Sequence, residues 1–287
     1  MTVLEAGVGT ETSVLSARGI TVRFGGLNAL SDVDLDVAPR SIAGLVGPNG
    51  AGKTTMLAVL SGLLRPTQGR VWLRGEDVTD ASAQARARGG IARTFQQPEL
   101  FLGLTVREHL VLADRVHFAP RRLWSDMLDP RSLLPASSAE NERVDGLLEL
   151  LNLTRVAKAP VAALPLGVCR LVEVGRALAG QPHVILLDEP LSGLDMKSSE
   201  NLLSVFQRVV AQTDRDVSLL MVEHDVAAVL ALSNWIFVLD FGERIAADCP
   251  DVIRRDPAVR SAYLGDEESV EGEPEDPVAG EGGEVEP

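Results

Sequence analysis

Short runs rich in β-forming residues open the chain, at residues 14–24 and around 35–37. The turn signal Gly25-Gly26 separates the two runs, and Pro39 follows the second. We expect both runs to form strands that pair as an antiparallel β flank.

Three later apolar runs, at residues 42–46, 184–187 and 217–222, each lead into a polar or glycine-rich loop. Continuous apolar runs without polar alternation are typical of parallel strands that are buried on both faces. They predict an α/β fold with a parallel-sheet core.

A helical lobe is predicted between the first two of these core strands, at about residues 98–180. Four apolar residues there share one face of a helix: Val144, Leu147, Leu148 and Leu151. The earlier part of the lobe, residues 115–138, is rich in Arg, Ser and Pro, and we expect an extended loop there.

The length of 287 residues favours one large α/β domain with an inserted lobe over two independent domains. We place this domain at residues 14–265, between a flexible N-terminus at 1–13 and a tail at 266–287. The tail holds ten acids and no Lys or Arg, so we expect it to be disordered. The remaining formal charge of −4, out of −14, leaves no basic surface of the kind that nucleic acids require, so we expect no nucleic-acid partner.

No stretch of the sequence approaches the ~18 uninterrupted apolar residues that a membrane-spanning helix needs. The strongest candidate, residues 218–241, is interrupted by Glu223, His224 and Asp225, which are costly in lipid, and it predicts strand, polar loop, helix and strand. The N-terminus also lacks the pattern of a secretory signal. We therefore expect the chain to stay in the cytosol.

Residues 47–55 match the phosphate-binding pattern GxxxxGK[ST], and they lie between an apolar strand and a helix-like run. Glycines let backbone N–H groups turn towards phosphate oxygens, and the helix that follows adds its positive end. We expect Lys53 to reach the β- and γ-phosphates and Thr54 to bind Mg²⁺. The candidate loop consists of Gly47, Pro48, Asn49, Gly50, Ala51, Gly52, Lys53, Thr54 and Thr55.

The apolar run at 184–187 ends in the adjacent acids Asp188 and Glu189. A buried strand that ends in acids brings carboxylates to the phosphate site in P-loop ATPases. We assign Asp188 to the Mg²⁺ shell. Glu189 points the other way along a strand, so we assign it as the base that polarises the attacking water. Taken alone, such a pair would more often cap a helix.

Further motifs in the same order make the chain resemble an ABC transporter ATPase, over about residues 14–265, and the resemblance implies the P-loop NTPase cassette fold. Residues 93–96, Arg-Thr-Phe-Gln, resemble the family's Q-loop. This implies that Gln96 contacts Mg²⁺ or the attacking water and moves with the membrane partner. A solvated loop glutamine is the alternative, and the Thr-Phe-Gln arrangement favours Gln96 over the neighbouring Gln97.

Three more residues occupy positions that resemble family motifs. Asp195, in Ser-Gly-Leu-Asp, resembles the D-loop residue that crosses the dimer interface, and it also suits a helix cap. His224, which follows the strand at 217–222, resembles the switch histidine that senses the γ-phosphate. Phe24 resembles the aromatic residue that stacks on adenine, although core packing is an alternative.

The signature segment departs from the family pattern Leu-Ser-Gly-Gly-Gln. Residues 164–168 are Leu-Pro-Leu-Gly-Val, so Leu164 and Gly167 match, whereas Pro165 and Val168 do not. The resemblance implies that this segment binds the γ-phosphate held by the other subunit. We expect a weaker contact there, because the serine hydroxyl is absent, although proline is compatible with a helix start.

Within the family, the chain most resembles the importers of branched-chain and other amino acids. The resemblance rests on residues 22–27, 93–96 and 251–265 and on the long insertion before the signature. The resemblance implies an ATP-binding and ATP-hydrolysing subunit that uses Mg²⁺ and powers import of branched-chain amino acids or related small polar solutes. Its implied partners are membrane-spanning permease subunits, a second ATPase subunit in a homo- or heterodimer and, indirectly, a solute-binding protein.

The implied place of such a subunit is the cytoplasmic face of the plasma membrane, as a peripheral protein. Two alternatives stay open. One is a regulatory ABC subunit that binds nucleotide and hydrolyses it weakly, which the altered signature suggests. The other is a non-transport ABC ATPase, for which the chain lacks a second cassette, a long coiled coil and a basic surface.

Overall fold

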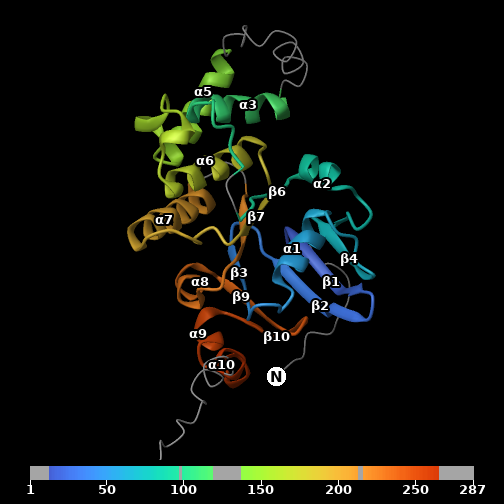
Figure 1. The fold of residues 1–287 in the computed structure, drawn as a ribbon. Helices are drawn as coiled ribbons and strands as arrows, with labels where there is room; N and C mark the ends of the chain where they lie inside the picture. Colours follow the sequence, from blue (N-terminus) through green and yellow to red (C-terminus); the bar gives the residue numbers. More distant parts are fainter. Residues whose placement is uncertain (1–12, 97–98, 119–136, 213–215, 265–287) are drawn as a thin grey trace, which may run out of the picture.

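The computed structural model describes residues 13–96, 99–118, 137–212 and 216–264. In Figure 1 a central sheet lies between a helical lobe at the top, a smaller sheet on the right and the last helices at the bottom. The predicted α/β fold with a parallel core, an antiparallel flank and an inserted lobe is confirmed.

The antiparallel flank is a four-stranded sheet in the order β2-β1-β4-β5. Its strands are β1 (Leu15–Phe24), β2 (Leu27–Val37), β4 (Gln68–Leu73) and β5 (Glu76–Asp77). The expected turn at Gly25-Gly26 joins β1 to β2, where Phe24 pairs with Leu27. The second predicted run, at 35–37, is therefore the end of a longer strand.

The core sheet has six strands in the order β10-β9-β3-β8-β7-β6. Its strands are β3 (Ile42–Val46), β6 (Ile91–Arg93), β7 (Val184–Asp188), β8 (Ser218–Val222), β9 (Trp235–Asp240) and β10 (Glu243–Asp248). All neighbours are parallel except β9 and β10. Every residue of β3, β7 and β8 is buried, which explains their unbroken apolar sequences.

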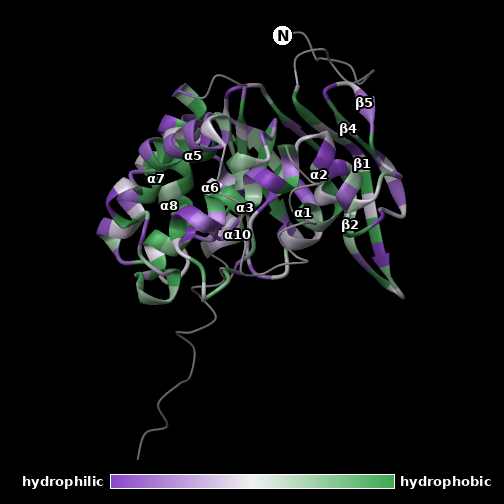
Figure 2. Cartoon of the chain, turned by 90° about the horizontal axis from the view of Figure 1, so that it is seen from above, coloured by the Kyte–Doolittle hydropathy of each residue, from purple (hydrophilic) through white to green (hydrophobic). Residues whose placement is uncertain are grey.

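Helices cover both faces of this core sheet. Alternate residues of β7 point to opposite faces, so Ile185 and Leu187 join one hydrophobic cluster and Val184 and Leu186 the other. The covering helices are α1 (Lys53–Ser61), α2 (Ala83–Gly89), α7 (Met196–Gln212), α8 (Val226–Leu232), α9 (Pro250–Ile253) and α10 (Pro257–Leu264). Figure 2 shows polar and apolar positions alternating around α7, as expected for a helix that is buried on one side.

The helical lobe contains α3 (Val106–Phe118), α5 (Ser138–Leu150) and α6 (Leu166–Ala179), together with short 3₁₀ turns at Thr154–Val156 and Val161–Ala163. Val144 and Leu148 are fully buried where α5 packs against its neighbours, and Leu147 packs there in part. The predicted apolar face of this helix is thus confirmed.

The loop expected at residues 115–138 is wrong at both ends. Arg115 lies inside α3, because its guanidinium is buried in an ion pair with Glu140 of α5. Ser137 and Glu140 form a capping box that starts α5 at Ser138. Charged residues that favoured a loop by composition instead pair across two helices. Residues 119–136 lie outside the described part of the chain.

The predicted flexible N-terminus, apart from Ser13, and the predicted acidic tail lie outside the described residues, and the boundaries at 14 and 265 stay predictions. The segment 218–241 forms strand, helix and strand, as expected. Among the described residues, no helix has both the length and the apolar character to cross a membrane.

Candidate nucleotide site

The predicted phosphate loop connects β3 to α1, between the strand and helix that its sequence context required. A Cβ atom at Gly47 would approach the Leu239 carbonyl oxygen to 2.2 Å, and one at Gly52 would approach that of Ala29 to 2.7 Å. The loop is therefore wedged between β9 and the flank, and these two positions require glycine. The remaining loop residues are exposed or half-buried at Pro48, Asn49, Gly50, Thr54 and Thr55, and buried at Ala51.

The Lys53 side chain folds back over this loop. Its ammonium donates hydrogen bonds to the carbonyls of Gly47 at 2.6 Å and Pro48 at 2.8 Å, and the residue is 7% exposed. Burial lowers the pKa of Lys53, whereas the Glu189 carboxylate acts in the opposite direction. The loop thus surrounds a desolvated cation, the group that a phosphate would be expected to bind.

The predicted acids lie at the carboxyl end of β7. Asp188 is the last residue of the strand and is buried. Glu189 lies beyond the strand with a left-handed φ of 45°, and its N–H donates to the Val222 carbonyl of β8 at 3.0 Å. The sequence predicts that strand alternation separates the two carboxylates. That reason for their separation is wrong, because Glu189 lies beyond the strand, where the backbone turns. Such a conformation is costly for a residue other than glycine and is typical of functional sites.

The residues 93–96 bring two side chains to these acids. The Gln96 amide donates to the Glu189 carboxylate at 2.8 Å, so Gln96 is not simply a solvated loop residue. Arg93 forms an ion pair of 2.9 Å with Asp188, in which both side chains are 10% exposed. Sequence reasoning missed the role of Arg93, although it lies in the quoted motif, because the pairing depends on β6 lying beside β7.

His224 and a second missed residue, Glu223, lie at the end of β8. Glu223 has no exposed surface, and its carboxylate accepts the Leu191 N–H at 2.7 Å. Burial raises the pKa of Glu223 to about 7, against the opposing effects of Leu191 and His224. The exposed His224 has its Nδ1 atom 3.8 Å from this carboxylate. The available signal was an acid between the end of an apolar strand and a candidate switch histidine.

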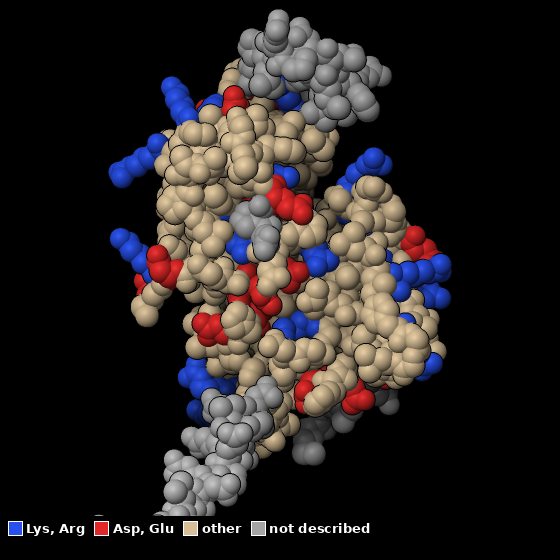
Figure 3. Space-filling model, in the orientation of Figure 1, with Lys and Arg blue, Asp and Glu red and all other residues tan. Residues whose placement is uncertain are grey.

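Phe24 is 54% exposed at the end of β1, so the alternative of core packing is wrong. The flank that carries it reaches the phosphate loop, since Leu30 of β2 lies against Gly52. An exposed aromatic ring on that sheet is available for stacking. In Figure 3, acidic and basic side chains are interspersed at the centre of the face, between the lobe and the flank.

Comparison with known proteins agrees with this geometry. Residues 30–192 match the ABC transporter family model, and residues 243–269 match the model of the branched-chain amino acid ATP-binding cassette transporter. The chain is 36% identical to the high-affinity branched-chain amino acid transport ATP-binding protein LivG of Escherichia coli, over 88% of this chain and 98% of that protein. It is 34% identical to BraF of Pseudomonas aeruginosa, a protein of the same description, with the same coverage.

The chain belongs to the ABC transporter ATP-binding family. A solved nucleotide-free ATP-binding cassette from an ABC transporter is similar in structure, with a TM-score of 0.75, 28% identity and coverage of 88% of this chain and 98% of that one. An ADP-bound cassette is equally similar, with a TM-score of 0.75, 28% identity and coverage of 88% and 99%. This ABC protein is thus an ATP-hydrolysing transporter subunit with a P-loop NTPase fold.

The D-loop candidate Asp195 caps helix α7 in this ABC ATPase. Its carboxylate accepts the Ser198 N–H at 2.7 Å, and this bond lowers the pKa of Asp195. The capping alternative is therefore confirmed. An exposed cap leaves the same side chain accessible, so the role at a dimer interface stays a prediction.

The altered signature segment starts helix α6 of the cassette. Pro165 is the N-cap residue, with φ −61°, and its side chain makes no capping bond. A Cβ atom at Gly167 would lie 3.1 Å from Ser198 of α7, so the glycine permits close packing there. Leu164 packs partly into the core. The expectation that proline is compatible with a helix start is confirmed.

Side chains of helix α6 also form hydrogen bonds with the backbone of the segment that carries Gln96. The Arg170 guanidinium donates to the backbone carbonyls of Phe95, at 2.9 Å, and of Gln96. The Glu173 carboxylate accepts the Glu99 N–H at 3.2 Å. Arg170 and Glu173 are both buried. Helix α6 and the chain at residues 95, 96 and 99 are therefore joined by hydrogen bonds and are expected to move together.

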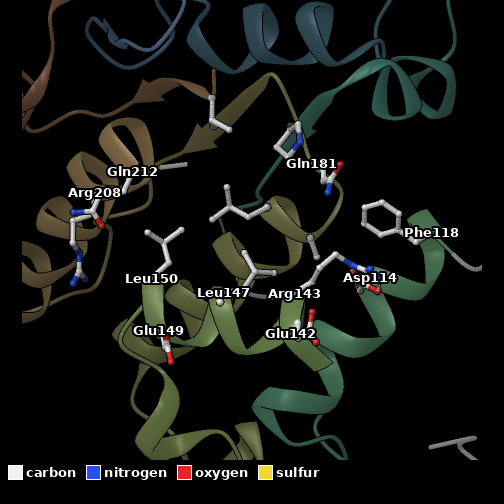
Figure 4. Close-up of a pocket in the computed structure, with 15 residues that line it drawn as sticks. Asp114, Phe118, Glu142, Arg143, Leu147, Glu149, Leu150, Gln181, Arg208 and Gln212 are labelled. Carbon is white, nitrogen blue, oxygen red and sulfur yellow. Dashed lines mark hydrogen bonds and ion pairs between the residues drawn. The ribbon is translucent and has the colours of Figure 1, made fainter. Parts of the chain in front are cut away.

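A cavity of about 730 Å³ lies between the lobe and the edge of the core, away from these residues (Figure 4). Its polar wall includes Arg143, which makes a bidentate ion pair with Asp114 at 2.7 and 2.6 Å. Leu147 and Leu150 supply part of the apolar wall. None of the residues proposed for the nucleotide site lines it.

Proposed function

We propose that this subunit powers the import of branched-chain amino acids or related small polar solutes. The observation that carries the proposal is the match of residues 243–269 to the branched-chain amino acid cassette model, on top of 36% identity to LivG over 88% of the chain. The solute itself would be chosen by the permease and a solute-binding protein, so the cassette supplies the driving reaction.

The nucleotide would lie on the loop 47–55, with Lys53 and the first turn of α1 at its phosphates and Phe24 at its adenine. Asp188, Thr54 and Gln96 offer carboxylate, hydroxyl and amide oxygens, the hard donors that Mg²⁺ prefers, so this donor set fits the ion. Bound with the nucleotide, Mg²⁺ would neutralise the phosphate charge that develops during hydrolysis.

Glu189 would act as the general base for the attacking water. Its contacts suit this role, because the Gln96 amide donates to one carboxylate oxygen of Glu189 at 2.8 Å, whereas the Asp188 carboxylate pairs with Arg93. His224, on the adjacent strand end, would contact the γ-phosphate. Lys53 would stabilise the charge on the same group.

The ABC arrangement would place the signature of one subunit over the phosphate loop of the other, so we propose a dimer with a second ATPase subunit. Arg170 donates hydrogen bonds to the backbone carbonyls of Phe95 and Gln96. Through these bonds, a movement of this segment caused by a permease would also move the signature helix. The complex would lie at the cytoplasmic face of the plasma membrane, with this chain as a peripheral subunit and a solute-binding protein outside.

The test is transport by the full complex, with its permeases and binding protein, in vesicles that contain ATP. We expect uptake of leucine, isoleucine or valine, and loss of uptake when Glu189→Gln replaces the wild-type subunit. Uptake of a different solute class, or of none although the complex hydrolyses ATP, would contradict the import proposal. Wild-type ATPase activity at the level of Glu189→Gln would instead favour a regulatory subunit with weak hydrolysis.

A further inference from the structure

Residues 93 and 96 contact both carboxylates that are proposed for the nucleotide site. Arg93 pairs with Asp188 at 2.9 Å, and Gln96 bonds to Glu189 at 2.8 Å. The arrangement follows from the register of two parallel strands, in which Arg93 lies opposite Leu186, two residues before Asp188. Neither comparison nor motif assigns a role to Arg93.

An unpaired carboxylate at the position of Asp188 would be costly, because burial removes most of its hydration. The guanidinium of Arg93 supplies the opposite charge. Its second anchor is the Ser61 hydroxyl of α1, at 3.1 Å. Arg93 therefore connects the helix after the phosphate loop to the end of β7.

The hydrogen bonding of Arg93 is incomplete, unlike that of the buried arginine nearby. Its Nε atom is buried and has no hydrogen-bond partner among the residues that the structure describes. By contrast, all three nitrogens of Arg86 donate to backbone carbonyls, at distances of 2.7 to 3.3 Å. A buried arginine with a purely structural role is expected to be satisfied in this way. Arg93 instead has Asp188 as its charged partner, and its guanidinium also lies over the Phe95 ring, 5.6 Å from the centroid.

We propose that Arg93 is a positioning residue that acts as an internal counter-ion for Asp188 while no nucleotide is bound, and that it yields this carboxylate to Mg²⁺ when Mg²⁺ and nucleotide enter. The proposal rests on the proposed Mg²⁺ role of Asp188. Two cations compete for one carboxylate, so the exchange lowers the apparent affinity for Mg²⁺ and keeps the empty site stable.

The experiment is thermal unfolding of the full chain, with wild type, Arg93→Gln and Arg93→Lys measured without ligand and with Mg²⁺ and a non-hydrolysable ATP analogue. Arg93→Gln is expected to lower Tm without ligand and to show a larger rise in Tm on binding than wild type. The Mg²⁺ midpoint at fixed analogue should fall by about fivefold. Arg93→Lys keeps the positive charge, so its Tm and its Mg²⁺ midpoint are expected to lie between those of wild type and Arg93→Gln.

Arg143→Gln is the matched control, because it breaks a bidentate ion pair with Asp114 that is remote from the loop. It should lower Tm by the same amount with and without ligand. The proposal would be overturned if both Arg93 variants also lowered Tm equally with and without ligand and left the Mg²⁺ midpoint unchanged. If Arg93→Gln fails to fold, Arg93→Lys tests the proposal alone: a lower Mg²⁺ midpoint than wild type supports it, and an unchanged midpoint contradicts it. A wild-type chain whose Tm does not respond to Mg²⁺ and analogue would overturn the proposed Mg²⁺ site as well.

Discussion

Gln96 donates a 2.8 Å hydrogen bond to the carboxylate of Glu189, although 93 positions separate the two residues. They meet because β6 and β7 are parallel neighbours and both residues follow the carboxyl ends of these strands. The proposed base is thus in contact with the segment that α6 holds by its backbone. Any shift of this segment would move the hydrogen-bond partner of the base.

Glu189→Gln should retain nucleotide binding and lose roughly 100-fold or more in turnover, because the amide cannot accept a proton from water. Binding should survive, since Lys53 and Asp188 remain. The measurements are ATPase rate and equilibrium binding of a fluorescent ATP analogue. Glu149→Gln, in the exposed part of α5, is the control and should match wild type. Near-normal turnover in Glu189→Gln would exclude this base.

Lys53→Ala should weaken nucleotide binding by about tenfold or more, because it removes charge-assisted hydrogen bonds to phosphate. In the described structure the same ammonium joins the carbonyls of Gly47 and Pro48, so the loop should also lose order. Titration with the fluorescent analogue gives the affinity. The exposed Lys158→Ala provides the comparison, and equal affinities for both variants would contradict the assigned role.

Glu223→Gln should change the pH dependence of stability. The pKa of Glu223 rises from 4.5 to about 7 on folding, so the folded chain keeps a proton that the unfolded chain releases between these values. The free energy of unfolding of the wild type should therefore fall, by up to roughly 3 kcal/mol from this group, as the pH rises through this window, and then level off.

The amide of Glu223→Gln does not titrate, and it can still accept the Leu191 N–H. Its Tm should therefore rise relative to wild type between pH 5 and pH 8. Unfolding curves across this range provide the measurement, with the exposed Glu142→Gln as the control. Parallel Tm profiles for Glu223→Gln and wild type would show that this carboxyl is not perturbed.

Pro165→Ser should raise both the stability of helix α6 and the turnover of the assembled transporter. Serine can cap the first turn, which Pro165 does not, and a cap contributes about 1 kcal/mol. The hydroxyl would also restore a hydrogen bond to the phosphate at the site completed for the partner subunit. Tm and ATPase rate give the two readouts.

The companion measurement for Pro165→Ser is the base mutation made in each ATPase subunit separately. If the altered signature weakens one site, removal of the base from this chain should reduce turnover more than removal from the partner. Equal effects of both base mutations, together with an unchanged rate for Pro165→Ser, would identify Pro165 as a neutral substitution in this family.

The error at residues 115–138 illustrates where local composition fails. Arg, Ser and Pro favoured a loop, but Arg115 is buried through its ion pair with Glu140, and α3 continues to Phe118. Pairing between helices overrode the local preference. By contrast, the apolar face at Val144 and Leu148 was predictable, because burial on one side imposes a helical period that the sequence records directly.

The sequence by itself determined the central core strands β3, β7 and β8, the glycine-rich loop and the acids at 188 and 189, because burial on both faces and close backbone packing restrict residue types locally. Tertiary structure alone decided which side-chain and backbone groups these side chains contact. The pairs Arg93–Asp188, Glu223–Leu191 and Arg170–Phe95 join residues that are 95, 32 and 75 positions apart. Their partners depend on strand order and helix packing, which sequence order does not specify.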